Sequence, residues 1–168
     1  AAAAQRRQSM EQGMSHTQQF YIDGAWVAPS GGRTLEVIDP STEEPFVTIA
    51  LGEAKDVDRA VAAARRAFPS FAATSRADRL ALMRRLLEAY KARYDDIARA
   101  LSREMGAPID FAQRSQAAMG TAHLARMIET LEHFQFEELR GSTLISKEPI
   151  GVVGMITPWN WPINQIMC

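Results

Sequence analysis

The sequence has little of what marks several large classes of protein. It holds one cysteine, so it cannot form an internal disulfide, and nothing in it indicates an oxidising compartment. No apolar run approaches the roughly 18 residues that a membrane span requires. A formal net charge of −1 provides no overall attraction to nucleic acid or to an anionic membrane. We therefore expect binding to neither of them, and a cytoplasmic location follows by default.

The amino-terminal residues lack the pattern of a secretory signal, because no apolar stretch follows Arg6 and Arg7. Residues 1–17 are predicted to be a disordered leader. Over the whole chain, 46% of residues are apolar and 23% are charged, which is ordinary for a globular protein with a core.

Short β-prone runs come first. Asp23-Gly24 separates two of them within residues 20–27, and this pair favours the positive φ angles of a type I′ turn, so a hairpin is predicted there. Residues 34–38 and 46–51 are predicted to be further strands.

After Gly52 the apolar spacing changes to that of helices. One apolar stripe is formed by Val57, Ala60, Val61, Ala64 and Phe68. The residues from Ser75 to Asp78 resemble a capping box that opens a second helix, whose stripe is Leu80, Met83, Leu87 and Tyr90. A third helix over 97–105 is predicted to end at Gly106, and a long helix is predicted from Asp110 to about Glu138.

The closing segment follows a different pattern. Residues 143–146 are predicted to be a short strand, and residues 150–157 are apolar on both faces, as in a strand buried inside a parallel sheet. Pro158 ends that run, and residues 163–167 begin a helix. The predicted fold class is therefore α/β, with small β elements, several helices and the start of a parallel sheet. That sheet is incomplete at the carboxyl end, since a parallel strand has no partner in this sequence.

Asn160 is the first candidate for chemistry. In open α/β sheets ligands bind beyond the carboxyl ends of the strands, where Asn160 would lie between Pro158 and Pro162. Its amide can donate a hydrogen bond to a developing oxyanion, and Trp159 and Trp161 can provide flat apolar walls. The alternative is a turn whose tryptophans complete a core.

The segment from Glu148 to Pro162, EPIGVVGMITPWNWP, resembles the signature of the aldehyde dehydrogenase superfamily. Upstream residues 22–26, 39–42 and 57–68 extend the resemblance from about residue 19 to the end. The resemblance implies that residues 18–138 form the first segment of an NAD(P)-binding domain and that residues 139–149 form an oligomerisation arm. It also implies that residues 150–168 begin the cofactor-binding sheet, with the oxyanion motif, and are truncated.

The resemblance also assigns roles to residues. Asn160 would stabilise the oxyanion of an aldehyde substrate. The residues implied to contact NAD or NADP are Ile156, Thr157, Pro158 and Trp159. The residues implied to begin the wall of the aldehyde tunnel are Trp161, Asn164, Gln165 and Cys168. The polar pair in that wall hints at a substrate that is not purely aliphatic, and homo-oligomers are implied as dimers or tetramers.

The sequence departs from the family where its chemistry is completed. The family needs a cysteine nucleophile and a glutamate that activates water, and both lie far beyond the P-W-N motif. Cys168 falls instead at a tunnel-wall position. We therefore expect the amino-terminal part of an aldehyde dehydrogenase with no turnover by itself. The alternative is a truncated, non-catalytic product that binds full-length subunits or has no activity at all.

Other candidate residues give weaker evidence for a functional site. His16, His123 and His133 lack metal-ligand spacing, so no metal site is expected, and the latter two are predicted to lie on solvated helix faces. The Arg65-Arg66 and Arg84-Arg85 pairs are interleaved with acidic residues, which favours an ion-paired surface over a nucleic-acid patch.

Overall fold

The structure, a computed structural model, describes residues 16–168. The predicted leader therefore lies outside the described residues, apart from His16 and Thr17. These two lie in a turn, and the Thr17 carbonyl accepts a hydrogen bond from the Ala50 amide at 3.1 Å.

The first hairpin confirms the expectation from Asp23-Gly24. β1 (Phe20–Ile22) pairs antiparallel with β2 (Ala25–Val27). Asp23 and Gly24 have φ angles of 56° and 79°, as a type I′ turn requires at both central positions. A second antiparallel pair follows, β3 (Thr34–Asp39) with β4 (Glu44–Ala50), close to the predicted bounds.

Two capped helices come next, α2 (Ala54–Ala72) and α3 (Arg76–Ala92). The predicted capping box of α3 is confirmed: the Ser75 hydroxyl accepts from the Asp78 amide at 3.1 Å, and the Asp78 carboxylate accepts from the Ser75 amide at 3.1 Å. The four stripe residues of α3 are half-buried or buried. The stripe of α2 is less covered, and the side chain of Val57 is 60% exposed.

α4 (Tyr94–Met105) ends at Gly106, whose φ of 69° is the left-handed conformation that terminates helices. It carries half of the main core, a cluster of buried residues that pack with Ile97, Met105 and Ile163. The members of this cluster are Ala98, Leu101, Ala112 and Ala117.

The long helix predicted from Asp110 is interrupted. It consists of α5 (Ile109–Phe111), a π-helical stretch η1 (Ala112–Ala117) and α6 (Ala118–His133). Two tyrosine hydroxyls donate hydrogen bonds to carbonyls of the wide π turns: Tyr90 to Ala117 at 2.7 Å, and Tyr94 to Gln113. The sequence shows the helix but not this widening, because the partners lie on α3 and α4.

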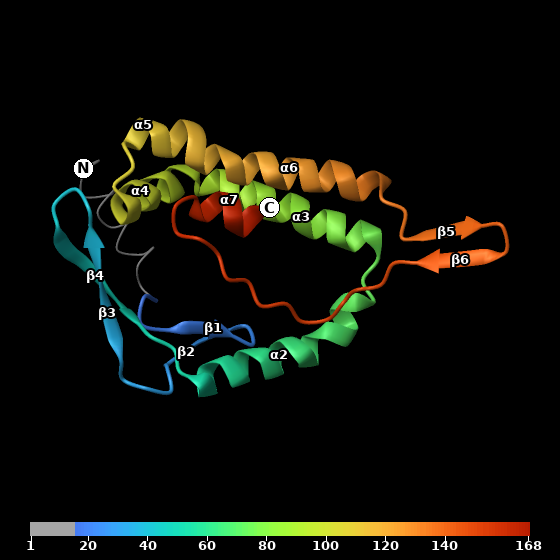
Figure 1. The fold of residues 1–168 in the computed structure, drawn as a ribbon, viewed down its shortest axis with the longest axis horizontal. Coiled ribbons are helices and arrows are strands. Elements are labelled where there is room, and N and C mark those ends of the chain that lie inside the picture. Colours follow the sequence, from blue (N-terminus) through green and yellow to red (C-terminus); the bar gives the residue numbers. More distant parts are fainter. Residues whose placement is uncertain (1–15) are drawn as a thin grey trace.

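The prediction that this helix extends to about Glu138 is wrong. Phe134 is extended, with φ −68° and ψ 129°, and its ring packs edge-on against Phe136 at 4.9 Å. Glu138 belongs to β5 (Glu137–Arg140), which pairs with β6 (Thr143–Ser146) and so satisfies its backbone groups in a ladder. This hairpin projects from the body of the molecule (Figure 1).

The strand expected over 150–157 does not form. These residues lie outside regular secondary structure, and Ile150 and Met155 are 93% and 75% exposed. The physical reason is the missing partner: a parallel strand needs a neighbour for its N–H and C=O groups, and no described residue supplies one. The helix that follows is confirmed as α7 (Pro162–Met167).

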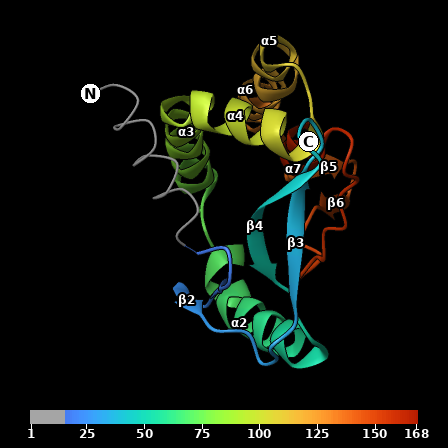
Figure 2. The ribbon, with the colours of Figure 1, turned by 90° about the vertical axis from the view of Figure 1, so that its left-hand side faces the viewer.

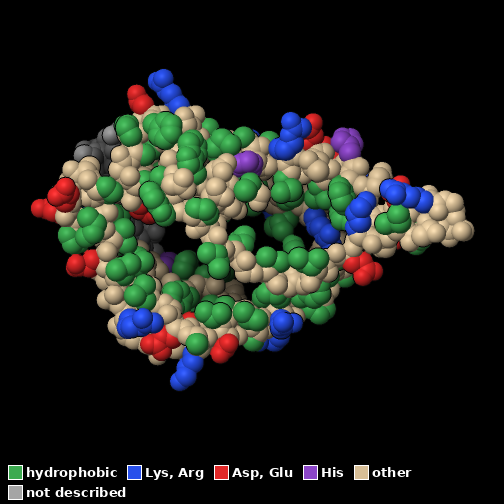
Figure 3. All heavy atoms as spheres, in the orientation of Figure 1, with side chains coloured by type: hydrophobic (Ala, Val, Ile, Leu, Met, Phe, Trp, Pro, Cys, Tyr) green, Lys and Arg blue, Asp and Glu red, His purple; other side chains and the backbone are tan. Residues whose placement is uncertain are grey.

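The elements surround an open centre. α2 lies on one side, α3, α4 and α6 form a helical layer on the other, and β3–β4 runs between them (Figures 1 and 2). The surface is hollowed between these parts, and hydrophobic side chains surround the hollow (Figure 3). α7 lies against α6 beside the hollow, so the motif segment that precedes it faces open space.

Candidate active site

The segment that carries the P-W-N motif is extended and accessible. From Glu148 to Asn160 it makes no backbone–backbone hydrogen bond to any residue from 16 to 168. Its side chains are similarly open, with Ile156 100% exposed and Trp159 82% exposed. Backbone and side-chain groups here are therefore available to a ligand or to another polypeptide segment.

α7 is fixed in place although the segment before it is open. Trp161 packs edge-on against Phe111 with ring centroids 5.6 Å apart. Ile163 packs on the main core, and Asn164 is hydrogen-bonded to His123 of α6, Nε2 to Oδ1, at 2.8 Å. Three different contacts thus hold the start of the helix, and with it the position of the residue just before Trp161.

Asn160 is that residue. Its side chain is exposed and makes no hydrogen bond to any described residue. An amide in this state keeps both N–H donors for a ligand. The structure thus leaves the predicted oxyanion donor accessible beside a fixed helix.

The residues expected to contact a dinucleotide are all exposed: Ile156, Thr157, Pro158 and Trp159. They fit such a group chemically, because the segment offers a free hydroxyl, uncommitted backbone amides and the flat face of an indole.

The predicted tunnel residues are divided by the structure. Trp161, Asn164 and Gln165 are half-buried where α7 meets its neighbours, whereas Cys168 is exposed. Among the described residues, the Cys168 sulfur has one hydrogen-bond partner, the Gln165 carbonyl at 4.0 Å. A backbone carbonyl is not a base, so no hydrogen bond to a described residue activates the thiol as a nucleophile.

His123 is the residue that the sequence did not reveal. It was expected on a solvated helix face, and that expectation is wrong, because the ring is half-buried and bonded to Asn164. The two residues are 41 positions apart, and no periodicity or motif links them. His133, at the end of α6, is exposed as predicted.

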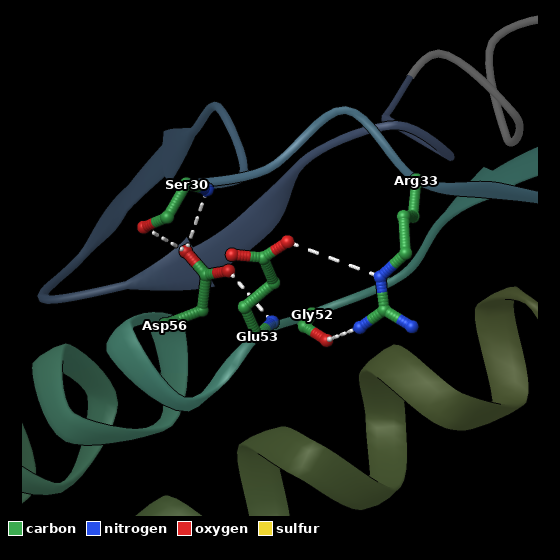
Figure 4. Close-up of polar contacts among 5 residues, drawn as sticks. All are labelled: Ser30, Arg33, Gly52, Glu53 and Asp56. Atoms are coloured by element: carbon green, nitrogen blue, oxygen red, sulfur yellow. Dashed lines mark hydrogen bonds and ion pairs between the residues drawn. The ribbon is translucent and has the colours of Figure 1, made fainter.

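A second polar cluster lies where the chain enters α2 (Figure 4). Asp56 is 4% exposed, and its carboxylate accepts hydrogen bonds from the Glu53 amide at 3.0 Å and from the Ser30 amide and hydroxyl at 2.9 and 2.8 Å. The Nη1 atom of Arg59 lies 3.6 Å from Oδ1 of Asp56, as an ion pair. These contacts occupy the carboxylate, so the cluster ties the loop after β2 to α2 and is not a ligand site.

This cluster predicts a pH dependence. Hydrogen bonds from the Glu53 amide and from Ser30 lower the pKa of Asp56. Because the folded pKa is depressed, the stabilisation is fully present above the ordinary aspartate pKa of about 3.9 and is lost as pH falls through the folded pKa. Asp56→Asn should therefore lower Tm at pH 7, and its deficit should shrink as pH falls below about 4.

Melting curves at several pH values measure this difference. Asp58→Asn is the matched control, since Asp58 is exposed on the same helix and makes no hydrogen bond to a described residue. A deficit for Asp56→Asn that stays constant between pH 7 and pH 3 would contradict the assignment.

Within residues 16–168 no group of three or more His, Cys, Asp or Glu side chains is placed to hold a metal ion. In the same part of the chain, no helix has the length and apolar character to cross a lipid bilayer.

The comparison with known sequences decides the family. The sequence pattern described as "Aldehyde dehydrogenase family" matches residues 26–168. The chain belongs to the aldehyde dehydrogenase family. Its sequence is 46% identical over 154 residues to a 3-succinoylsemialdehyde-pyridine dehydrogenase from a Pseudomonas species, covering 91% of this chain and 32% of that protein. The resemblance that the motif indicated is thus confirmed.

Solved structures of aldehyde dehydrogenases share the fold. The enzyme from Bartonella henselae matches with a TM-score of 0.87 at 44% identity, over 90% of this chain and 33% of its own. Aldehyde dehydrogenase C from Pseudomonas syringae, crystallised with NAD⁺ and octanal, matches with a TM-score of 0.89 at 42% identity, over 91% and 32%. The α/β fold class is confirmed, and the chain spans about a third of the length of these aldehyde dehydrogenases.

Proposed function

We propose that this chain forms the amino-terminal part of an NAD(P)⁺-dependent aldehyde dehydrogenase, which oxidises an aldehyde to a carboxylic acid. The observation that carries the proposal is Asn160, an uncommitted amide in the family's P-W-N motif, next to a helix held by three contacts. An amide there donates to the oxygen of the aldehyde as negative charge develops on it.

NAD⁺ or NADP⁺ accepts the hydride in this reaction. Residues 156–159 contact it in our proposal, and their exposure supports this, because neither their side chains nor their backbone amides are engaged by described residues. Crystallisation of the Pseudomonas syringae relative with NAD⁺ supports the same choice.

The relatives do not agree on the aldehyde. One is named for a semialdehyde joined to pyridine, and another was crystallised with octanal. Sequence identities of 46% and 42% to these two proteins therefore do not identify the substrate. In our proposal the choice of aldehyde is made by the tunnel residues of this chain, which are Trp161, Asn164, Gln165 and Cys168.

The 168-residue chain should have no dehydrogenase turnover by itself. The family mechanism needs a thiolate with a nearby base, and the single cysteine of this chain is an exposed thiol whose described contact is a backbone carbonyl. The chain should supply the oxyanion donor and part of the cofactor contact, while the nucleophile comes from other residues.

The test joins the two parts. The fusion enzyme begins with this chain. After Cys168 it continues with the part of the 3-succinoylsemialdehyde-pyridine dehydrogenase from the Pseudomonas species that follows the matched segment of that protein. It should fold with one cooperative melting transition and form NADH from NAD⁺ and an aldehyde. The chain alone and the remaining portion of the relative alone are the controls, and neither should form NADH.

Two results would contradict the proposal. A folded fusion enzyme that forms no NADH with any of a panel of aldehydes would reject the enzymatic role. NADH formation by the 168-residue chain above the blank would reject the claim that the nucleophile comes from other residues.

The projecting β5–β6 hairpin supports an additional role in assembly. Leu139 and Leu144 face each other in the ladder and are 70% and 61% exposed, which is unusual for paired leucines unless another surface covers them. We infer that this arm joins copies into a homo-oligomer.

Leu139→Asp with Leu144→Asp should shift the fusion enzyme toward the monomer mass in size exclusion with light scattering, because buried unpaired carboxylates are costly in an interface. Ser142→Asp, at the exposed turn of the same hairpin, is the control and should leave the mass unchanged. An unaltered mass for the double variant would exclude the hairpin from the interface.

A further inference from the structure

Three positively charged side chains meet two phenylalanine rings at the base of the β5–β6 hairpin. The rings of Phe134 and Phe136 pack edge-on, with centroids 4.9 Å apart. The guanidinium carbons of Arg76 and Arg79 lie 5.9 and 5.8 Å from the Phe136 centroid, and Nζ of Lys147 lies 5.1 Å from the Phe134 centroid. We call these five residues the cation–ring cluster. α3 begins beside the base of the hairpin, and Lys and Arg side chains are grouped there (Figures 1 and 3).

Neutral acceptors hold the three cations in place. Arg76 donates to the Phe134 carbonyl at 2.5 Å, and Lys147 donates to the Gln135 carbonyl at 2.9 Å. Arg79 donates to the last carbonyl of α2 at 2.8 Å. Each cation keeps further N–H groups that bond to no described residue, so the cluster has a fixed geometry and free donors.

The positive charge of the cluster is not neutralised by an ion pair. Within residues 16–168, none of the three cations lies within ion-pair distance of a carboxylate. Arg79 is half-buried, and the acidic side chain that adjoins the cluster is Glu148. Three cations and one carboxylate leave a net positive charge, which favours an anion because charge-assisted hydrogen bonds are the strong ones.

A pocket of about 300 Å³ opens at the cluster, a volume at the lower end of the range typical of small-molecule sites. Its lining residues are Arg79, Phe134, Phe136, Lys147, Glu148 and Pro149. Phe134 is 37% exposed, so its ring can pack against the ring of a ligand. The pocket thus offers a flat apolar surface beside two cationic donors.

We propose that the cation–ring cluster binds a small aromatic carboxylate. The carboxylate accepts hydrogen bonds from Arg79 and Lys147, and the aromatic ring of the ligand packs on Phe134 and Phe136. No residue of this pocket is among those expected to contact the cofactor or the aldehyde. It is a second binding site, and it does not depend on the proposed dehydrogenase function.

A purely structural role for the cluster makes a different prediction. If the cations only anchor the link between α6 and β5, their replacement lowers stability and no ligand is bound. If the cluster is a binding site, the ligand must carry both a ring and a negative charge. Probes that lack one of the two therefore separate the roles.

The first experiment titrates the 168-residue chain, with ¹⁵N-labelled arginine side chains, with three probes. Benzoate has the ring and the charge, benzamide has the ring without the charge, and acetate has the charge without the ring. The Arg79 Nε–H resonance should shift with benzoate, with a dissociation constant about 10-fold lower than for either other probe. Equal affinity for benzoate and one of the others, or no shift with benzoate, would overturn the proposal. Tighter binding of inorganic phosphate than of benzoate would also overturn it.

Two variants remove one charge each and keep an N–H donor for the backbone carbonyl. Arg79→Gln and Lys147→Gln should each raise the benzoate dissociation constant about 10-fold in calorimetry. Lys147 is exposed, so its variant reports on binding even if Arg79→Gln unfolds the chain. Arg85→Gln is the matched control, because it removes the same charge at an exposed position of α3 and should leave the affinity unchanged. Unchanged affinity in Lys147→Gln would overturn the proposal.

The second experiment repeats the calorimetry with the fusion enzyme. Lys147→Gln should again weaken benzoate about 10-fold. Equal affinity of the fusion enzyme and its Lys147→Gln variant would show that the added residues cover the pocket, and it would overturn the site. A fusion enzyme that oxidises no aldehyde but loses benzoate affinity in Lys147→Gln would reject the proposed function and support the second site.

Discussion

Asn160→Ala should lower kcat of the fusion enzyme by about 10²- to 10³-fold, because removal of one oxyanion donor typically has this effect. The loss should appear in kcat more than in KM. A neutral aldehyde carbonyl binds the donor weakly, whereas the charged oxygen of the tetrahedral intermediate binds it strongly.

The same substitution should leave Tm unchanged. The Asn160 side chain is exposed and bonded to no described residue, so its truncation removes no contact of the fold. A fall in kcat of this variant therefore reports the loss of the hydrogen-bond donor and not a loss of folded protein.

Steady-state kinetics with a melting curve for each variant provide the test. Asn160→Asp should be at least as impaired as Asn160→Ala, because a carboxylate repels the oxyanion. Wild-type kcat in Asn160→Ala would show that the oxygen is stabilised elsewhere, and the Asn160 assignment would be wrong.

Gly120→Ala should reduce the free energy of unfolding by about 1–3 kcal/mol, the usual effect of inserting a carbon into a packed contact. Gly120 lies on α6 where α3 crosses it. A Cβ at this position would be 2.3 Å from Cζ of Tyr90 and 2.4 Å from its hydroxyl oxygen.

The tyrosine cannot move aside without further loss. Its ring is 4% exposed, and its hydroxyl donates to the Ala117 carbonyl at 2.7 Å. Burial also raises the pKa of Tyr90 to about 12, so the hydroxyl stays protonated and remains a donor well above neutral pH.

Urea titration of the 168-residue chain measures this effect. Gly32→Ala is the control, because a Cβ there meets nothing within 4 Å and φ is not positive. In a Tyr90→Leu background, Gly120→Ala should be less harmful than in the wild type, since the two positions are in contact. Equal destabilisation in both backgrounds would mean that the clash is relieved elsewhere.

Local signals in the sequence predicted local structure well. Asp23-Gly24 specified its turn because few other residue pairs adopt two positive φ angles in succession. Ser75 and Asp78 specified a helix start, and Gly106 a helix end, because each satisfies or terminates backbone groups within a few residues. The motif around Asn160 identified the family for a different reason. It is a long run of specific residues, EPIGVVGMITPWNWP, which unrelated sequences do not share by chance.

Three features required the tertiary structure. The strand expected over 150–157 is absent because strand formation depends on a neighbour that no described residue supplies. The π turns of η1 depend on hydroxyls from α3 and α4. The end of α6 at His133 depends on the competing ladder of β5 and β6.

In the candidate site, too, some features follow from the local sequence and others only from the tertiary structure. The sequence alone predicted that Asn160 belongs to an oxyanion motif and that residues 156–159 and a short helix adjoin it. Only the tertiary structure decided that His123 meets Asn164, because that contact joins residues 41 positions apart on two helices. Neighbours in sequence interact through the backbone that they share, whereas distant residues meet only through the packing of the elements that carry them.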